Sequence, residues 1–234
     1  MKLAVIPARG GSKRIPRKNI KQFAGKPMIT WSIDAAIESG CFDRVIVSTD
    51  DQEIAEIARQ SGAEVPFLRP AELSDDYATT SDVIRHAINW LAESDVSPER
   101  VCCIYATAPF LRASDLARGF DLLEERGADF AFSATSYAFP IQRAIRLTSE
   151  GRVEMLMPEQ FSTRSQDLDE VYHDAGQFYW GRSEAWLSGK PVFSSFATAL
   201  ILPRYLVQDI DMPDDWLRAE LMFKALHESD AALS

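Results

Sequence analysis

The chain has 234 residues, of which 35 are acidic and 25 basic, and its formal net charge is −10. It is long enough for one large domain with a buried core, but its longest apolar runs fall short of the roughly 20 residues that cross a bilayer. Its acidity argues against nucleic acid as a partner. We therefore expect a globular protein that binds neither membranes nor nucleic acid.

The first residues of the chain and its cysteines predict a cytoplasmic location. The opening MKLAVIPARGG has too short an apolar stretch for a secretory signal. Cys41, Cys102 and Cys103 show no metal-ligand spacing, and two of them are adjacent in an apolar run. We expect buried thiols in a reducing compartment.

Strand and helix patterns alternate over the first 135 residues. Apolar runs of strand length recur between segments in which apolar residues return every three or four positions. The expected strands are 2–7, 44–50, 63–70, 101–110 and 128–135, and the expected helices are 27–39, 51–61, 79–94 and 114–125. Thr79, with Asp82 three residues on, is typical of a capping box at a helix start.

This alternation predicts a mostly parallel sheet with helices on both faces, a three-layer, Rossmann-like α/β fold. Ligands of such sheets bind at the carboxyl ends of the strands. The loop after the first strand therefore lies where a ligand is expected.

The alternation of strand and helix patterns stops between about 136 and 180. Short β-like pieces at 143–147 and 152–157 have no helix between them. We expect a small β-rich insert, used in dimer contact, within a single domain that spans 1–234. Strands are expected again at 175–181 and 198–203. A terminal helix is expected over 212–226, where Asp214 and Asp215 in the first turn suit the helix dipole.

The loop after the first strand collects positive charge. Eight basic residues and no acidic ones precede Asp34. Gly10 and Gly11 permit a sharp turn and close approach to a ligand, and exposed amides there could cradle phosphate. Arg9, Lys13 and Lys18 are the cations expected to contact an anionic ligand. Those expected to set the local field or face water are Arg14, Arg17, Lys21 and Lys26.

The loop lacks two common nucleotide-binding patterns. Neither G-x-x-x-x-G-K-[ST] nor G-x-G-x-x-G is present, so the sequence supports neither a P-loop nor a dinucleotide fingerprint. The simpler alternative, a solvated basic loop, stays open at this point.

Asp209 and Asp211 are candidate metal ligands. Carboxylates two residues apart in an extended segment project to the same side, and oxygen ligands suit Mg²⁺, which also bridges to substrate phosphates. The alternative is that Asp211 only caps the helix that starts near Pro213.

Four stretches together resemble the cytidylyltransferases that activate acidic sugars as CMP-sugars. They are LAVIPARGGSKRIPRKNI (3–20), FDRVIVSTDDQEIAEIA (42–58), LRPAELSDDYATT (68–80) and QDIDMPDDWLRAE (208–220). The first contains the family's A-R-x-x-S-K-x-x-x-x-K-N pattern. The resemblance implies the fold of nucleotide-diphospho-sugar transferases and the transfer of CMP from CTP to a sugar hydroxyl with release of pyrophosphate.

The resemblance also implies roles for individual residues. Arg9, Lys13 and Lys18 would act on the triphosphate as catalytic residues, and Asp209 and Asp211 would hold Mg²⁺. The residues that would line the nucleotide site are Ala8, Arg9, Gly10, Gly11, Ser12, Asn19, Arg69, Ala78 and Thr80. From the residues alone, Arg69 could equally be a surface arginine paired with Glu72 or Asp75, and Thr80 part of a helix start.

The stretch HDAGQFYW (173–180) resembles the branch of the family that uses pseudaminic acid, a nine-carbon acidic keto-sugar with two acylamino groups. Tyr105 stands where relatives that use sialic acid have glutamine, so a different sugar pocket is expected around it. Arg164 and Gln177 are candidates for the carboxylate and acylamino groups, although surface pairing and cross-strand hydrogen bonding explain them nearly as well. We expect His173 to be structural rather than a base.

Three alternative functions stay open. One is the same transfer to N-acetylneuraminic or legionaminic acid. The second is a protein that binds nucleotides without catalysis. The third is nucleic-acid binding through the basic loop, which predicts a steep salt dependence.

Overall fold

A computed structural model describes residues 1–75 and 77–233. The strands are β1 (Lys2–Pro7), β2 (Gln22–Phe23), β3 (Lys26–Pro27), β4 (Arg44–Ser48), β5 (Arg100–Ile104), β6 (Phe130–Ser136), β7 (Ile145–Leu147), β8 (Val153–Met155), β9 (Tyr172–Arg182) and β10 (Ala197–Ile201). The helices are α1 (Met28–Glu38), α2 (Gln52–Gln60), α3 (Thr80–Ala92), α4 (Ala113–Glu125), α5 (Ser183–Leu187) and α6 (Pro213–Leu233). Among the described residues, no helix combines the length and apolar character needed to cross a membrane.

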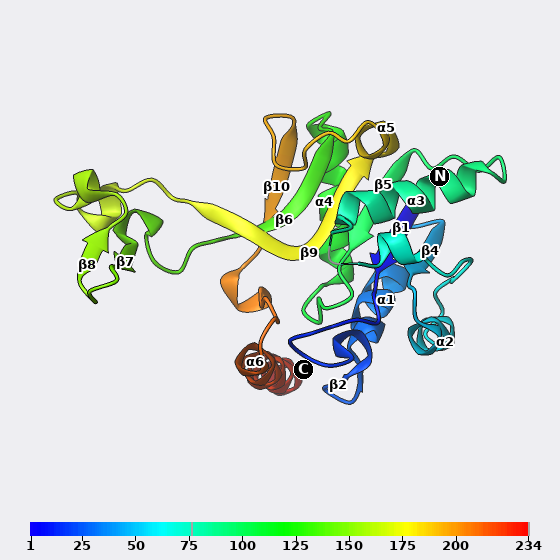
Figure 1. Cartoon of the computed structure of the whole chain (residues 1–234), viewed down its shortest axis with the longest axis horizontal. Coiled ribbons are helices and arrows are strands. Elements are labelled where there is room, and N and C mark those ends of the chain that lie inside the picture. The colour runs from blue at the N-terminus through cyan, green and yellow to red at the C-terminus, as the bar shows by residue number, and fades with distance from the viewer. Residues whose placement is uncertain (76, 234) are drawn as a thin grey trace.

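The central sheet confirms the predicted α/β class. Six strands pair in the order β10-β6-β9-β5-β1-β4. β1 runs parallel to β4 and β5, and β10 runs parallel to β6. Only β9 is antiparallel to its neighbours β5 and β6. The sheet is therefore mostly parallel, with one long reversed strand in its middle (Figure 1).

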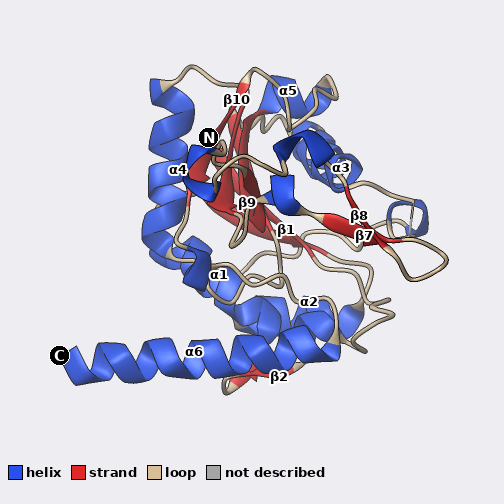
Figure 2. Ribbon diagram, turned by 90° about the vertical axis from the view of Figure 1, so that its left-hand side faces the viewer, coloured by secondary structure: helices blue, strands red, loops and turns tan. Residues whose placement is uncertain are grey.

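Two apolar layers bury both faces of the sheet. Side chains alternate along β1, so Ala4 and Ile6 join the cluster beneath α1 and α4, whereas Leu3 and Val5 join the cluster beneath α3 and α5. A continuous apolar strand needs such cover on both sides. Figure 2 shows α4 and α3 on opposite sides of the sheet, with α6 running below it.

A third apolar cluster attaches α6 to the rest of the body. Trp216 and Phe223 of α6 pack their rings against Phe23 of β2, with ring centroids 5.5 and 5.3 Å apart. Because β2 follows directly on the basic loop, this packing places the start of α6, and the segment before it, beside that loop.

Two predicted strands differ in extent from those observed. The stretch 63–70 forms only isolated bridges at Glu64 and Leu68, because Pro66 lacks the N–H that a ladder needs. The strand predicted over 101–110 ends at Ile104. The chain then forms a loop that lines the cavities described below.

The segment between β6 and β9 forms an arm, residues 137–171, that extends away from the body (Figure 1). β7 and β8 pair antiparallel within it. Its apolar side chains are largely exposed, namely Phe139, Ile145, Leu147, Val153, Leu156 and Phe161.

Candidate functional site

Two adjoining cavities open beside the loops that follow β1 and β5. The first has a volume of about 500 Å³ and is lined by the basic loop, the start of α3 and Asp211. The second has about 620 Å³ and is lined by parts of β6, β9 and the segment leading to α6. Tyr105 and Thr107 line both cavities, so the loop after β5 is their common wall.

The basic loop is held close to the start of α2. The Gly10 N–H donates to Oδ1 of Asp50 at 3.0 Å, and a Cβ at Gly10 would lie 2.6 Å from Oδ2 of Asp51. Asn19 Nδ2 donates to the Arg9 carbonyl at 2.9 Å and braces the loop from its other end. Gly10 is therefore needed for close packing, and its amide is occupied within the chain rather than presented to phosphate.

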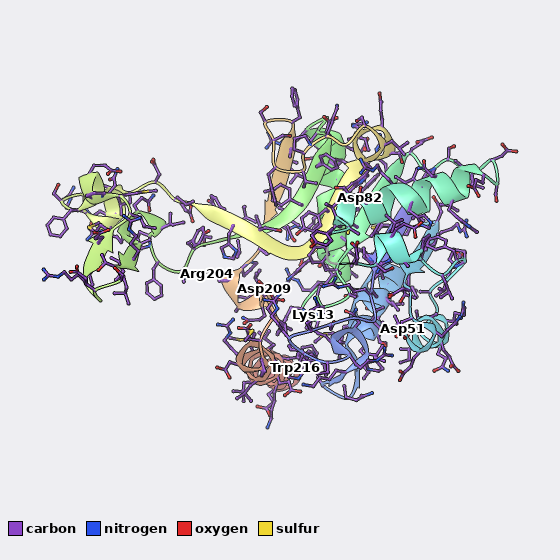
Figure 3. The ribbon with its side chains drawn as sticks, viewed as in Figure 1. Lys13, Asp51, Asp82, Arg204, Asp209 and Trp216 are labelled. Carbon is purple, nitrogen blue, oxygen red and sulfur yellow. The ribbon has the colours of Figure 1, made fainter. Side chains whose placement is uncertain are left out.

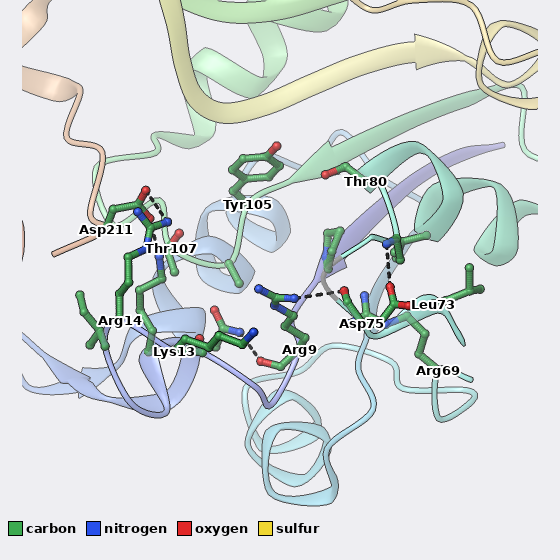
Figure 4. A pocket seen from close by; sticks show the side chains of 18 residues that line it. Arg9, Lys13, Arg14, Arg69, Leu73, Asp75, Thr80, Tyr105, Thr107 and Asp211 are labelled. Carbon is green, nitrogen blue, oxygen red and sulfur yellow. Dashed lines mark hydrogen bonds and ion pairs between the residues drawn. The ribbon is translucent and has the colours of Figure 1, made fainter. Parts of the chain in front are cut away.

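The first cavity gathers cations from several segments. Arg9, Lys13, Arg14 and Lys18 of the loop line it together with Arg69 (Figure 4). Arg9 Nη1 donates to the Asp75 carbonyl at 3.1 Å. Such a lining suits a ligand with several negative charges.

Arg69 is the most buried of these cations, with 3% of its side chain exposed. Its guanidinium lies 3.8 Å from Asp50, and its Nε donates to Ser74 Oγ at 3.2 Å. Burial lowers the pKa of Arg69, and the Asp50 charge partly opposes this shift. The alternative interpretation of Arg69, a surface arginine paired with Glu72 or Asp75, is not the arrangement that the structure shows.

The other loop cations divide into two groups. Arg17 binds Asp51 and Glu53, Lys26 binds Asp34, and Lys21 lies over the Trp216 ring, so these three act within the protein. Arg14 was expected to belong with them, but it lines the cavity and binds Asp211 at 2.8 Å.

Asp209 and Asp211 lie where the two cavities meet. Asp211 lines the first and Asp209 the second, and Figure 3 shows Asp209 with Arg204 between β10 and α6. Lys18 Nζ contacts the Ile210 carbonyl at 2.8 Å and Asp211 Oδ1 at 3.3 Å, tying the loop to this segment.

The capping alternative for Asp211 is not supported by its contacts. Asp215 accepts hydrogen bonds from the N–H groups of Asp211 and Met212, so Asp215 stabilises the helix start, in the first turn where acids were expected. The Asp211 carboxylate instead contacts Arg14 and Lys18.

Burial and the neighbouring Asp211 charge raise the pKa of Asp209. A divalent cation would relieve this repulsion, because carboxylate oxygens are the ligands that Mg²⁺ prefers. The two aspartates are therefore suitable ligands for such an ion and would hold it at the boundary of the two cavities. Among the described residues, no group of three or more His, Cys, Asp or Glu gathers as a metal cage.

The second cavity carries charges that the sequence did not single out. Arg204 and Arg218 line it, together with His173 and Asp174. Arg204 donates to the Tyr137 carbonyl at 3.3 Å, and Arg218 lies 3.4 Å from Asp215. Arg204 lies outside the four family-like stretches, and Arg218 lies within the stretch 208–220 but was given no role there. The only available signal was their position on either side of Asp209 and Asp211 in the chain.

Not every predicted residue lines a cavity. Ser12, Asn19, Ala78, Thr80 and Tyr105 do. Ala8, Gly10 and Gly11 belong to the same loop but line neither cavity. Gln177 is buried and donates to the Leu206 carbonyl at 2.6 Å. Arg164 lies on the arm, 72% exposed and 2.7 Å from Asp167.

The profile of the cytidylyltransferase family matches residues 3–198 of this chain. A pseudaminic acid cytidylyltransferase of Campylobacter jejuni is 46% identical over 97% of this chain and 98% of that protein. A CMP-N,N'-diacetyllegionaminic acid synthase of Legionella pneumophila is 33% identical over 97% and 98%, respectively. A solved CMP:2-keto-3-deoxy-manno-octonic acid synthetase complexed with CTP has a TM-score of 0.69 and 15% identity, covering 96% of this chain and 98% of that one, which shows a shared fold.

Proposed function

The chain belongs to the cytidylyltransferase family, and we propose that it transfers CMP from CTP to pseudaminic acid and releases pyrophosphate. The observation that carries the proposal is the pair of adjoining cavities, one lined by cations and the other containing arginines, with Asp209 and Asp211 between them. The similarity to the Campylobacter jejuni enzyme supports this choice of sugar.

CTP occupies the first cavity in this proposal. Arg9, Lys13 and Lys18 bind the triphosphate, where charge builds on the departing pyrophosphate. Arg14 also lines this cavity, where it contacts Asp211, and would join them. Arg69, Ala78 and Thr80 also line this cavity and would hold the cytosine and ribose. Figure 4 shows Arg69 and Thr80 on the side of the cavity away from Lys13 and Arg14.

The acidic sugar occupies the second cavity. Arg204 and Arg218 replace Arg164 as our candidates for its carboxylate, because guanidinium groups bind carboxylates through paired hydrogen bonds. The sugar's anomeric hydroxyl then faces the boundary between the cavities, beside Tyr105 and Thr107.

Transfer consists of one displacement at the α-phosphorus. The anomeric oxygen forms a new bond to the α-phosphorus as its hydroxyl proton passes to solvent. The bond from the α-phosphorus to the oxygen that bridges to the β-phosphate breaks, so pyrophosphate leaves with that oxygen. Such reactions depend mainly on aligning the attacking and leaving oxygens and on stabilising charge. We propose that Asp209 and Asp211 hold Mg²⁺, which when bound supplies a Lewis acid for the phosphate oxygens.

Pyrophosphate release in a panel of sugars tests the proposal. Purified protein is incubated with CTP, Mg²⁺ and one of pseudaminic, N,N'-diacetyllegionaminic or N-acetylneuraminic acid. We expect the highest kcat/KM with pseudaminic acid. A higher value with another sugar would reassign the substrate, and release with none would leave a nucleotide-binding protein without this activity.

Assembly and location complete the proposal. The exposed apolar side chains of the arm support a homodimer, in which Arg164 would reach a sugar only in the partner's cavity, because it lies outside both cavities of its own chain. The three cysteines are buried free thiols, which suits the reducing cytoplasm.

A further inference from the structure

The aspartate pair lies on a segment that regular secondary structure does not fix. This aspartate segment, residues 207–212, follows the short turn Arg204–Leu206 and belongs to no helix or strand. Ile210 within it is nevertheless only 2% exposed, so the segment is packed against the body. Figure 3 shows Asp209 on this segment, between β10 and α6. Because its backbone has no ladder of its own, donors from elsewhere in the chain must hold it in place.

Gln177 of β9 supplies one of these donors. Its Nε2 donates at 2.6 Å to the carbonyl of Leu206, three residues before Asp209. Its own carbonyl accepts from the Tyr105 N–H at 2.9 Å. Gln177 therefore joins the aspartate segment to the loop after β5, the common wall of the two cavities. It is 3% exposed and lines neither cavity, so it can affect a ligand only through these neighbours.

Two further side chains hold backbone carbonyls of the same part of the chain. Thr135 of β6, which is 2% exposed, donates from Oγ1 to the Leu202 carbonyl at 2.8 Å. Lys18 of the basic loop donates to the Ile210 carbonyl at 2.8 Å. Gln177 and Lys18 therefore hold the backbone on either side of the first aspartate, one from the sheet and the other from the basic loop.

The Gln177 side chain makes no other hydrogen bond with the described residues. Its Oε1 is buried and has no partner among them. Methionine is unbranched, of similar length, and has no N–H. The Gln177→Met variant would therefore remove the bond to Leu206 and leave the backbone bond to Tyr105 in place.

We propose that Gln177 is a positioning residue for the aspartate pair, with Thr135 in support. By holding the Leu206 carbonyl, it keeps Asp209 beside Asp211 at the boundary of the two cavities, where both carboxylates can contact one divalent cation. This inference rests on the proposed function. It gives Gln177 a role other than contact with the acylamino groups of the sugar, which its burial prevents.

CTP binding with and without a divalent cation tests this role. The Kd of CTP is measured by calorimetry with excess EDTA and again with saturating Mn²⁺, a probe that suits the same oxygen ligands as Mg²⁺. The ratio of the two values is the cation enhancement, and we expect tighter binding with Mn²⁺ in the wild type. We expect Gln177→Met to reduce the enhancement about tenfold, the change in affinity that corresponds to one hydrogen bond, while its Kd in EDTA stays within about twofold.

Gln142→Met is the matched control. Gln142 lies on the arm and lines neither cavity. Its Nε2 also donates to a backbone carbonyl, that of Asp169, at 2.9 Å, and its Oε1 is also buried without a partner among the described residues. This control loses the same kind of bond through the same substitution, and it should keep the enhancement of the wild type.

The outcomes separate this inference from the proposed function. An unchanged enhancement in Gln177→Met overturns the inference, even if CTP binding weakens equally with and without Mn²⁺, because that pattern indicates a purely structural role. A wild type without any enhancement also overturns it, since the aspartates would then hold no cation. A wild type that shows the enhancement but transfers CMP to no sugar contradicts only the proposed function.

A second variant covers the case in which Gln177→Met does not fold. Thr135→Val keeps the shape of the side chain and removes its donor to the Leu202 carbonyl. Thr135 lines the second cavity and not the first, so the Kd of CTP in EDTA should not change. The enhancement must fall in this variant, and an unchanged value overturns the inference.

Discussion

Arg9 and Lys18 come from opposite ends of one loop, and backbone carbonyls far along the chain hold both of them. Arg9 donates to the carbonyl of Asp75, and Lys18 to that of Ile210. Such bonds orient the cations over the first cavity and fix the charge before a ligand arrives. Preorganised charge of this kind stabilises a transition state without reorganisation during the reaction.

Replacing Arg9 by Ala should lower kcat by at least about a hundredfold, the size expected when one electrostatic donor is lost. Lys21→Ala is the matched control, because Lys21 belongs to the same loop but lies over Trp216 and lines neither cavity. We expect its kcat within twofold of the wild type. Steady-state pyrophosphate release measures both, and a near-normal rate in Arg9→Ala would remove Arg9 from the mechanism.

His86 of α3 makes stability depend on pH. It packs against Phe67 with its Nδ1 buried and without a partner among the described residues. Burial lowers the pKa of His86, the nearby Arg69 charge lowers it further, and Glu93 and Glu72 oppose the shift. The unfolded chain therefore takes up a proton at higher pH than the folded one, so this contribution to stability is lost as pH falls below about 6.5.

The melting temperature of the wild type should accordingly fall more between pH 7.5 and 5.5 than that of His86→Gln, which cannot take a charge. Thermal unfolding of the two proteins in matched buffers measures the difference. Parallel losses in both would contradict the assignment.

Sequence patterns located the basic loop and the aspartate pair but not the full lining of the second cavity. The basic loop and the aspartate pair each lie within a short continuous stretch of sequence, which is why they could be recognised. The structure places Arg9, Lys13, Lys18 and Asp211 around one cavity. Arg204 and Arg218 come from different segments that meet only after α6 has packed. The direction of the Gln177 side chain likewise depends on the bulge between β6 and β9. No local sequence pattern predicts that bulge.

At the scale of elements, the start of α3 forms one edge of the first cavity. Thr79 accepts from the Asp82 N–H while Asp82 accepts from the Thr79 N–H, so the predicted capping box is confirmed. The cap fixes Ala78 and Thr80 on either side of it, and both line the cavity.

Thr79→Ala should lower the free energy of unfolding by about 1 kcal/mol, the usual cost of a lost N-cap. Thr79→Ser keeps the hydroxyl and should stay close to the wild type. Denaturant titration measures all three proteins. A Ser variant as unstable as the Ala variant would show that the cap is not the cause.

The order of strands and helices was predictable because buried strands and amphipathic helices have different periods. The extent of a predicted strand was less accurate where a proline interrupts it. Around Pro66, isolated bridges replace the expected strand. The direction of β9 was not predictable, since the pattern of 175–181 indicates a strand without saying which way it runs. That reversal places His173 and Asp174, at the start of β9, in the lining of the second cavity.

At the scale of the molecule, the arm carries an exposed apolar surface that lies away from the body. Leu147 and Val153 face each other across β7 and β8 with 70% and 60% of their surfaces exposed. We expect light scattering to give the mass of a dimer for the wild type and of a monomer for Leu147→Glu. Leu221→Glu, at a similarly exposed position on α6, should remain dimeric. A monomeric wild type would contradict the expected homodimer.

The most direct test of the account is a crystal structure of the protein with CTP and Mg²⁺. We expect the triphosphate to lie in the first cavity and to contact Arg9, Lys13 and Lys18. We expect the cation to be bound by Asp209 and Asp211. Phosphates bound elsewhere, or a metal that leaves both aspartates without contact, would contradict the central claim.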